Sequence, residues 1–165
     1  MSDVKPYNVD TIADYVILSL NSDENYPLIN LKLQKLIYYI QAWSLGINGE
    51  SLFNARFEAW VHGPVCIELY NRFRNTKNLY SVITNSDVLN HSAKDVIQPN
   101  DVEFVDYILE NYARCSCTQI EAMTHNEKPW IEARKGYEPM ERCQVQITNE
   151  MMKTYYAQRY NEIPD

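Results

Sequence analysis

The stretch NLKLQKLIYYIQAWSLG, residues 30–46, constrains the fold of this chain more than any other. Its apolar residues recur every three or four positions, the spacing of one helix face, and are Leu33, Leu36, Ile37, Ile40 and Trp43. We expect Asn30 to cap the start of this helix and Gly46 to end it. Lys32, Lys35 and Gln41 should mark more polar flanks. So much apolar surface indicates a central helix that other elements cover on more than one side.

Helical periodicity also precedes and follows this segment. Residues 9–20 place apolar side chains on one face, with Asn8 as the expected N-cap. Another helix should begin near Pro64, because a proline in a first turn loses no helical hydrogen bond. Residues 75–100 are rich in Asn, Ser and Asp, which predicts a mostly irregular and variable connection with a short extended piece at 80–84.

The last third of the chain contains four more helix signals. Asn100 should cap a long helix, and Thr118 and Glu121 stand in capping-box spacing before a second one. A short helix is expected from Pro129, and a final helix after Thr148.

Two segments change to the two-residue period of a strand. In ARFEAWVH, residues 55–62, Phe57 and Ala59 alternate with polar neighbours, and RCQVQIT, residues 142–148, alternates in the same way. A lone strand has no partner for its backbone groups, so the two are expected to pair. The sequence therefore predicts a mainly α fold with a small β-sheet (α+β): one compact helical domain over residues 1–165 with two or three short strands.

Composition narrows the function classes. The 165-residue chain has a net charge of -7, which disfavours a nucleic-acid binder, and only 4 glycines, which disfavours a phosphate loop. No run of apolar residues is long enough to cross a bilayer, and the first residues lack a secretory pattern, so a cytoplasmic protein is expected. Its four cysteines are then expected to be reduced thiols.

The residues that could carry chemistry form no recognised constellation. Cys115 and Cys117 make one tight pair without a second, whereas structural zinc sites use two pairs. No local signature joins a nucleophile to His62, His91 or His125, and no two carboxylates stand out. We therefore expect no catalytic residue, no metal and no cofactor.

Two tryptophans and two histidines in the sequence have two interpretations. Trp60, His62, His125 and Trp130 could bind a ligand, or they could lock a corner of the fold through hydrogen bonds to backbone carbonyls. The second interpretation is favoured because buried polar groups are normally satisfied.

Three segments, in order and at the expected spacing, resemble the Panacea domain family, the SocA-like and phage-associated GepA-like antitoxins. They are LKLQKLIYYIQAWSL, LFNARFEAWVHGPVCIELYNRF and THNEKPWIEAR, and the likeness runs from about residue 7 to 156. The family-motif residues, which we expect to be mainly structural, are Leu33, Gln34, Lys35, Leu36, Tyr38, Phe57, Trp60, His62, Gly63, Pro64, Val65, Tyr70, Thr124, His125, Pro129 and Trp130. His125, Pro129 and Trp130 should pack near the Gly63-Pro64 corner.

The resemblance implies an antitoxin, carried by a prophage or mobile element, that neutralises a cognate toxin by direct protein–protein binding. SocA-like members can also deliver the toxin to a protease, so a proteolytic adaptor is an alternative, as is a phage-encoded regulator that binds a host protein. An enzyme acting on a small molecule is a third possibility. No cofactor, membrane partner or direct nucleic-acid binding is expected. The partner-binding tyrosines should be exposed and are Tyr38, Tyr70, Tyr80, Tyr155 and Tyr156, together with residues 75–100.

Overall fold

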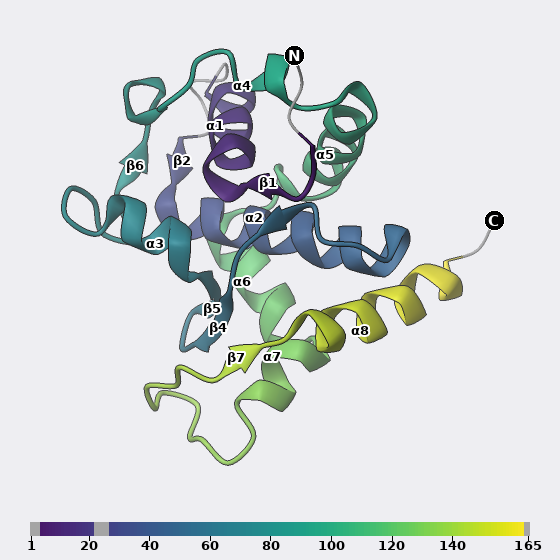
Figure 1. Cartoon of the computed structure of the whole chain (residues 1–165). Helices are drawn as coiled ribbons and strands as arrows, with labels where there is room; N and C mark the ends of the chain where they lie inside the picture. Colours follow the sequence, from purple (N-terminus) through teal and green to yellow (C-terminus); the bar gives the residue numbers. More distant parts are fainter. Residues whose placement is uncertain (1–3, 22–26, 164–165) are drawn as a thin grey trace.

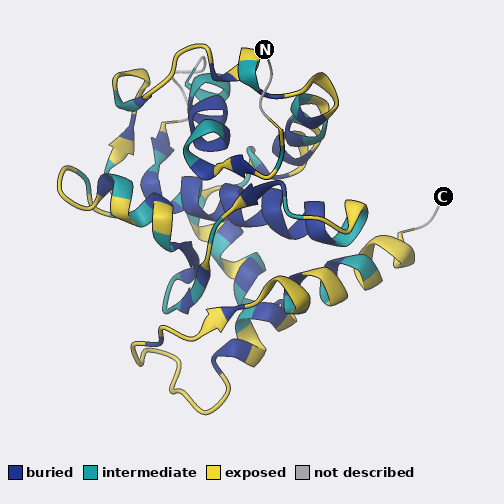
Figure 2. Ribbon diagram, in the orientation of Figure 1, coloured by how far each residue is buried: buried dark blue, intermediate teal, exposed yellow. Residues whose placement is uncertain are grey.

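The computed structural model describes residues 4–21 and 27–163, and its centre is the predicted helix α2, Asn30–Trp43. Figure 1 shows α1 and α5 on one side of α2, and α6 and α8 on the other. The predicted apolar stripe is buried along its whole length, and almost all of α2 is dark blue in Figure 2. The fold is compact and mainly helical with small sheets, as the sequence predicts.

The two ends of α2 differ from expectation. Ile29 is the N-cap residue, and Asn30 is the first helical residue, whose Nδ2 donates to the Asn78 carbonyl at 3.1 Å. The helix does not end at Gly46 but continues as a π-helical turn, η1, Ser44–Asn48, which Gly49 ends at φ +74°. Gly46 is needed for another reason, because a Cβ there would lie 2.6 Å from the Tyr156 Cβ.

The remaining helices pack on α2 or on the elements beside it. They are α1 Val9–Leu20, α3 Ile67–Phe73, α4 Ala93–Val96, α5 Pro99–Tyr112, α6 Cys117–His125, α7 Lys128–Ala133 and α8 Asn149–Glu162. Their buried apolar side chains join those of α2 in one connected cluster.

Some helix starts are predicted correctly and others are displaced. Asn8 caps α1 by accepting the Asp10 N–H at 2.8 Å, and Thr148 caps α8 as expected. The predicted cap at Asn100 is wrong, because α5 starts at Pro99, which fits a first turn. The capping box of α6 is formed two residues before the predicted pair, by Ser116 and Gln119.

A three-stranded antiparallel sheet contains the predicted strand pair. Its order is β5 (Gly63–Cys66), β4 (Phe57–Trp60) and β7 (Gln146–Ile147). Phe57 lies opposite Ile147, so the expected pairing of these two segments is confirmed.

The segment from Pro64 is a strand before it is a helix. We expected helix from the first turn at Pro64, but β5 runs to Cys66 and pairs with β4, and α3 begins only at Ile67. The Gln34 side chain accounts for this, since it binds both the N–H and the carbonyl of Cys66.

The predicted variable connection is largely irregular but is anchored to the core. It contains β6 (Val82–Ile83), which pairs with β2 (Leu28–Ile29), and a 3-10 turn, η2 (Asn85–Asp87). The buried Asp14 carboxylate accepts the N–H groups of Leu89 and Asn90 at 3.2 and 3.0 Å. Near the N-terminus, β1 (Tyr7–Asn8) pairs with β3 (Phe53–Asn54) in parallel.

Two further findings concern the described residues. None of the helices between residues 4 and 163 is long and apolar enough to span a membrane. All four cysteines are free thiols, and the described part of the chain contains no group of three or more His, Cys, Asp or Glu that could hold a metal ion.

Candidate functional site

The three motif segments converge on the β4–β5 hairpin. Lys35, expected on a polar flank of α2, is completely buried, and its Nζ donates to the Pro64 carbonyl at 2.9 Å. Burial lowers the pKa of Lys35 from 10.5 to about 7, against the opposing effect of the Glu121 carboxylate. Gln41 is also buried rather than flanking, and its side chain binds the backbone of Leu52 and Phe53. The polar side chains Lys35 and Gln41 of α2 thus hold the backbone of β5 and of the chain at the start of β3.

Gly63 lies at the point where the three segments touch. Its φ of +109° favours glycine, and a Cβ there would lie 2.5 Å from the Lys35 Cε and 2.8 Å from the Thr124 Oγ1. The Thr124 hydroxyl donates to the Glu121 carbonyl at 2.8 Å. Lys35 from the first motif and Thr124 from the third therefore both pack against Gly63 in the second.

The last motif closes over the outer side of the hairpin. The Trp130 Nε1 donates to the Trp60 carbonyl at 2.8 Å, and the His125 ring stacks on Trp130 with 4.1 Å between centroids. Arg134, which sequence reasoning missed, donates to the Ala59 carbonyl at 2.9 Å. Trp130 thus contacts the hairpin and His125 packs on Trp130, as expected, whereas Pro129 is buried in α7.

His62 contacts a carboxylate rather than the backbone carbonyls that we expected. Its Nδ1 lies 2.9 Å from the Glu121 Oε1, and its Nε2 is 3.4 Å from the Tyr80 hydroxyl. The His125 Nε2 lies 3.9 Å from the same Glu121 oxygen, and burial lowers the pKa of His125. The two histidines therefore share one acid on α6.

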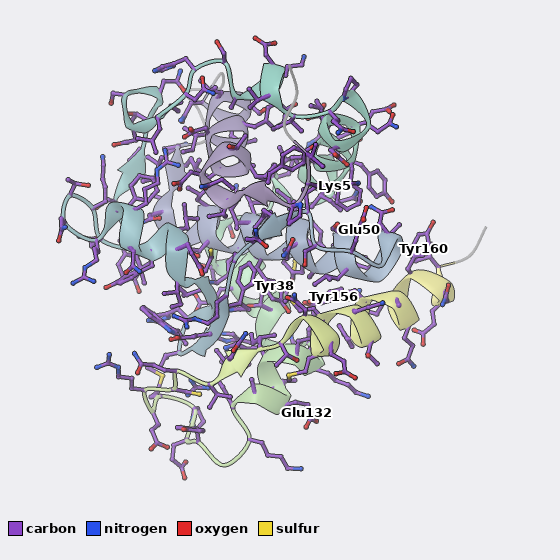
Figure 3. All side chains as sticks on the ribbon, viewed as in Figure 1. Lys5, Tyr38, Glu50, Glu132, Tyr156 and Tyr160 are labelled. Carbon is purple, nitrogen blue, oxygen red and sulfur yellow. The ribbon has the colours of Figure 1, made fainter. Side chains whose placement is uncertain are left out.

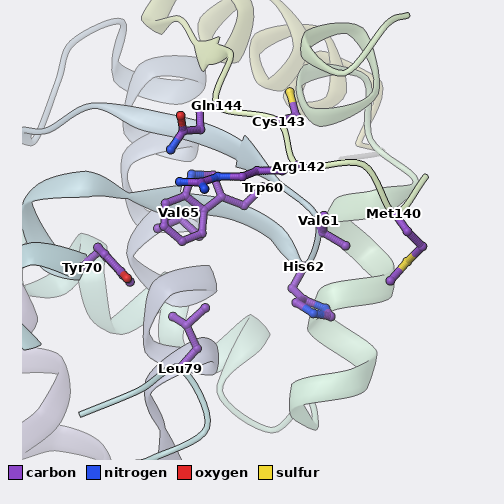
Figure 4. Close-up of a pocket in the computed structure, with 10 residues that line it drawn as sticks. All are labelled: Trp60, Val61, His62, Val65, Tyr70, Leu79, Met140, Arg142, Cys143 and Gln144. Carbon is purple, nitrogen blue, oxygen red and sulfur yellow. The ribbon is translucent and has the colours of Figure 1, made fainter. Parts of the chain in front are cut away.

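A solvent-open pocket of about 320 Å³ adjoins the hairpin. Figure 4 shows Trp60 and His62 on its walls, facing Tyr70 and the segment from Met140 to Gln144. The Trp60 Nε1 donates to Glu58 at 2.9 Å, and its ring meets Tyr70 edge-on at 4.9 Å. The cluster of motif residues around the β4–β5 hairpin thus has a buried part, around Lys35, and a partly exposed part at this pocket.

Glu127, inside the third motif, organises a second buried polar cluster that sequence reasoning missed. Its Oε1 accepts the hydroxyls of Tyr39 and Tyr156 at 2.8 and 2.7 Å, and its Oε2 accepts the Arg159 Nη1 at 2.7 Å. Burial raises the pKa of Glu127, while the phenols and Arg159 act in the opposite direction. This carboxylate joins α2, α7 and α8. The sequence of the third motif contains no signal that its glutamate, Glu127, is buried.

The expectation that Tyr38 and Tyr156 are exposed is wrong. Their exposed fractions are 1% and 0%, and the two rings face one another between α2 and α8 (Figure 3). The large apolar surface of α2 requires a cover, and α8 supplies it through Tyr156. Tyr70 and Tyr155 are half-buried, and Tyr80 is exposed. Tyr70 and Tyr80 lie beside the hairpin pocket, whereas Tyr155 lies on the other side of α7.

The fold and the interlocked corner define a small helical α+β protein in which three separated motifs hold one hairpin. A family model described as "Antitoxin SocA-like, Panacea domain" matches residues 33–131, and the chain belongs to this family. The predicted membership of the Panacea family is confirmed. The match includes every family-motif residue named from the sequence, from Leu33 to Trp130.

A curated relative agrees with the family match. The chain is similar to the antitoxin SocA of Caulobacter vibrioides (strain NA1000 / CB15N), with 30% identity over 138 residues that cover 79% of this chain and 73% of the relative. No solved structure matches the chain.

Proposed function

We propose that this protein is an antitoxin that neutralises a cognate toxin by binding it directly as a folded protein. The observation that carries the proposal is membership of the SocA-like antitoxin family, supported by the similarity to SocA over most of both chains. The single family domain is proposed to cover residues 1–165, and its location is expected to be cytoplasmic, as is usual for reduced thiols.

The motif residues are proposed to be mainly structural and to take no part in catalysis. Lys35 and Gln34 are bonded to the hairpin backbone, and His62 pairs with Glu121 rather than with a nucleophile. Burial raises the pKa of the Cys66 thiol to about 12, which suppresses the reactive thiolate. These contacts support a scaffold that presents its surface to another protein.

Co-expression tests the proposal. The protein encoded by the gene next to this one is the probe, induced alone and together with this chain. We expect growth arrest from the neighbour alone, rescue by this chain, and co-purification of the two proteins at a fixed ratio. Failure of both rescue and co-purification would contradict the proposal.

Proteolytic delivery is the alternative that the same strains distinguish. An adaptor lowers the steady-state level of the toxin and needs a working cytoplasmic protease, whereas a sequestering antitoxin leaves the toxin intact in a stable complex. Rescue that disappears in protease-deficient cells would favour the adaptor. A chain with no toxic neighbour that captures a host protein would favour a regulator.

A further inference from the structure

An apolar groove opens at the end of the molecule away from the hairpin. It has a volume of about 240 Å³ and lies between α5, the C-terminal end of the central helix and the last turn of α8. Tyr107, Tyr160 and Ile163 stand on its rim with exposed fractions of 53%, 45% and 55%, and Met123 forms part of its lining. Figure 3 shows Tyr160 near the projecting end of α8.

Single exposed apolar side chains are ordinary on protein surfaces, but three around one hollow are not. Tyr107 comes from α5, whereas Tyr160 and Ile163 come from the C-terminal end of α8, more than fifty positions later in the chain. Tyrosine combines a large contact area with few rotatable bonds, which makes it a common anchor at protein interfaces. The groove therefore has the apolar centre that a docking site requires.

The border of the groove is acidic. Glu103 and Glu110 are exposed and lie on the same face of α5 as Tyr107, four residues before it and three after it. Neither forms an ion pair with another described residue. Glu162, between Tyr160 and Ile163 in sequence, adds a third carboxylate.

Two arginines near the groove do not cancel this charge. Arg159 binds the buried Glu127 carboxylate at 2.7 Å, so its charge is already compensated. Arg114 is exposed just beyond the end of α5, four positions after Glu110. Among the described residues around the groove, three carboxylates without an ion pair thus outnumber one guanidinium without an ion pair, on a chain whose net charge is -7.

We propose that this groove is the toxin-docking site, and that it receives an apolar segment of the toxin flanked by Lys or Arg. The inference rests on the proposed antitoxin function and adds to it the surface and the chemistry of the partner. Acidic borders repel one another, so charge disfavours a second copy of this chain as the occupant. A basic segment gains both burial of its apolar side chains and electrostatic attraction.

Binding measurements with the neighbour-encoded protein test the apolar centre. Tyr107→Ala and Tyr160→Ala should each raise the dissociation constant roughly 10- to 30-fold, because each removes an aromatic anchor. Tyr80→Ala tests the rival surface: this tyrosine, a partner-binding candidate from the sequence, is also exposed but lies beside the hairpin pocket. If the toxin docks in the groove, this replacement should change affinity less than about twofold. Unchanged melting temperatures confirm that the variants are folded.

Charge reversal tests the border. Glu110→Lys should slow association about tenfold at low salt, because steering acts mainly on the association rate. Glu132→Lys on α7 makes the same change in net charge away from the groove (Figure 3) and should leave the rate close to that of the wild type. An equal effect of both reversals would show general attraction and overturn the assignment of the groove.

The outcomes separate the groove from the antitoxin function. If the wild type binds the toxin and the groove variants bind it equally well, the assignment of the groove as the docking site is wrong, and the antitoxin function stands. A larger loss with Tyr80→Ala would move the interface to the hairpin pocket and also overturn the proposal. A dimer that dissociates with Tyr160→Ala would show a second copy in the groove. If the wild type neither binds nor rescues, both proposals fail.

Discussion

Gly63 is the residue on which the three motifs depend most directly. Gly63→Ala would force a side chain into an unfavourable φ of +109° and place its Cβ 2.5 Å from the Lys35 Cε. We expect it to lower the free energy of unfolding by about 2–4 kcal/mol, the sum of backbone strain and overpacking. Urea unfolding measures this change.

Gly136 supplies the control for that prediction. Its φ of +93° is also positive, but nothing lies within 4 Å of a Cβ there. Gly136→Ala should therefore show backbone strain alone, about 1–2 kcal/mol. Equal losses at the two glycines would show that the contact with Lys35 and Thr124 contributes nothing.

Lys35 should make stability depend on pH. Its pKa is about 7 when folded and 10.5 when exposed, so between these values the unfolded chain binds more protons. Stability then rises with pH through this window. Relative to Lys35→Met, which has no titrating group, the wild type should gain about 2 kcal/mol between pH 7 and pH 9.

Urea unfolding of wild type and Lys35→Met at several pH values checks this. The difference in stability between the two proteins isolates Lys35, because the tyrosines and cysteines are the same in both. A difference that stays constant from pH 7 to pH 9 would contradict a depressed pKa.

The residue scale also shows where sequence reasoning stops. The apolar stripe of α2 could be predicted because burial of apolar surface imposes a helical period. The burial of Lys35 and Gln41 could not, since each is satisfied by strand backbone that only the folded chain brings near. Likewise, Tyr156 differs from the half-buried Tyr155 only by the direction in which α8 presents it.

Among the elements, α8 depends on close contact with the end of the central helix. Gly46→Ala would place a Cβ 2.6 Å from the Tyr156 Cβ and 2.7 Å from its backbone. We expect a net loss of about 1–3 kcal/mol, although alanine is the better helix former. Amide hydrogen exchange should show faster exchange in α8 than in α1; uniform protection would contradict this local effect.

Glu127 joins the same helix to the core through its charge. Glu127→Gln removes the carboxylate that Arg159 and two phenols share, and should cost about 1–3 kcal/mol. Glu132→Gln, on the exposed side of α7, should stay within about 0.5 kcal/mol of the wild type. Thermal unfolding of both variants measures the difference, and similar losses would show that the buried cluster is not special.

Element types were more predictable than element boundaries. The long helices and the β4–β7 pairing follow from hydrophobic period and from the need of a strand for a partner. The sequence predicts a helix at Pro64 instead of the strand β5, because Pro64 and the apolar residues after it fit a helical first turn equally well. Gln34 decides between the two by binding Cys66 on both sides, and that contact spans thirty-two positions.

For the whole molecule, the scaffold and the proposed interface should separate in a growth assay. Gly63→Ala should rescue cells at low temperature and fail at high temperature, because it reduces the folded fraction. Tyr160→Ala should fail at both temperatures with normal protein levels, because it removes an anchor and leaves the fold intact. Rescue counts and immunoblots at two temperatures check this, and identical temperature profiles would contradict the separation.

The third strand of the hairpin sheet comes from β7, and the cover of the central helix comes from α8, so both leave the ribosome after the other described elements. A nascent chain that still lacks these residues leaves the backbone of Phe57 and Glu58 without its second neighbouring strand and the tyrosines of α2 open to water. The native state of this domain is thus reached only after α8 has been synthesised. A premature stop codon before α8 would yield an unprotected, protease-sensitive product, and a cell that halts translation would obtain no partial supply of active protein from unfinished chains.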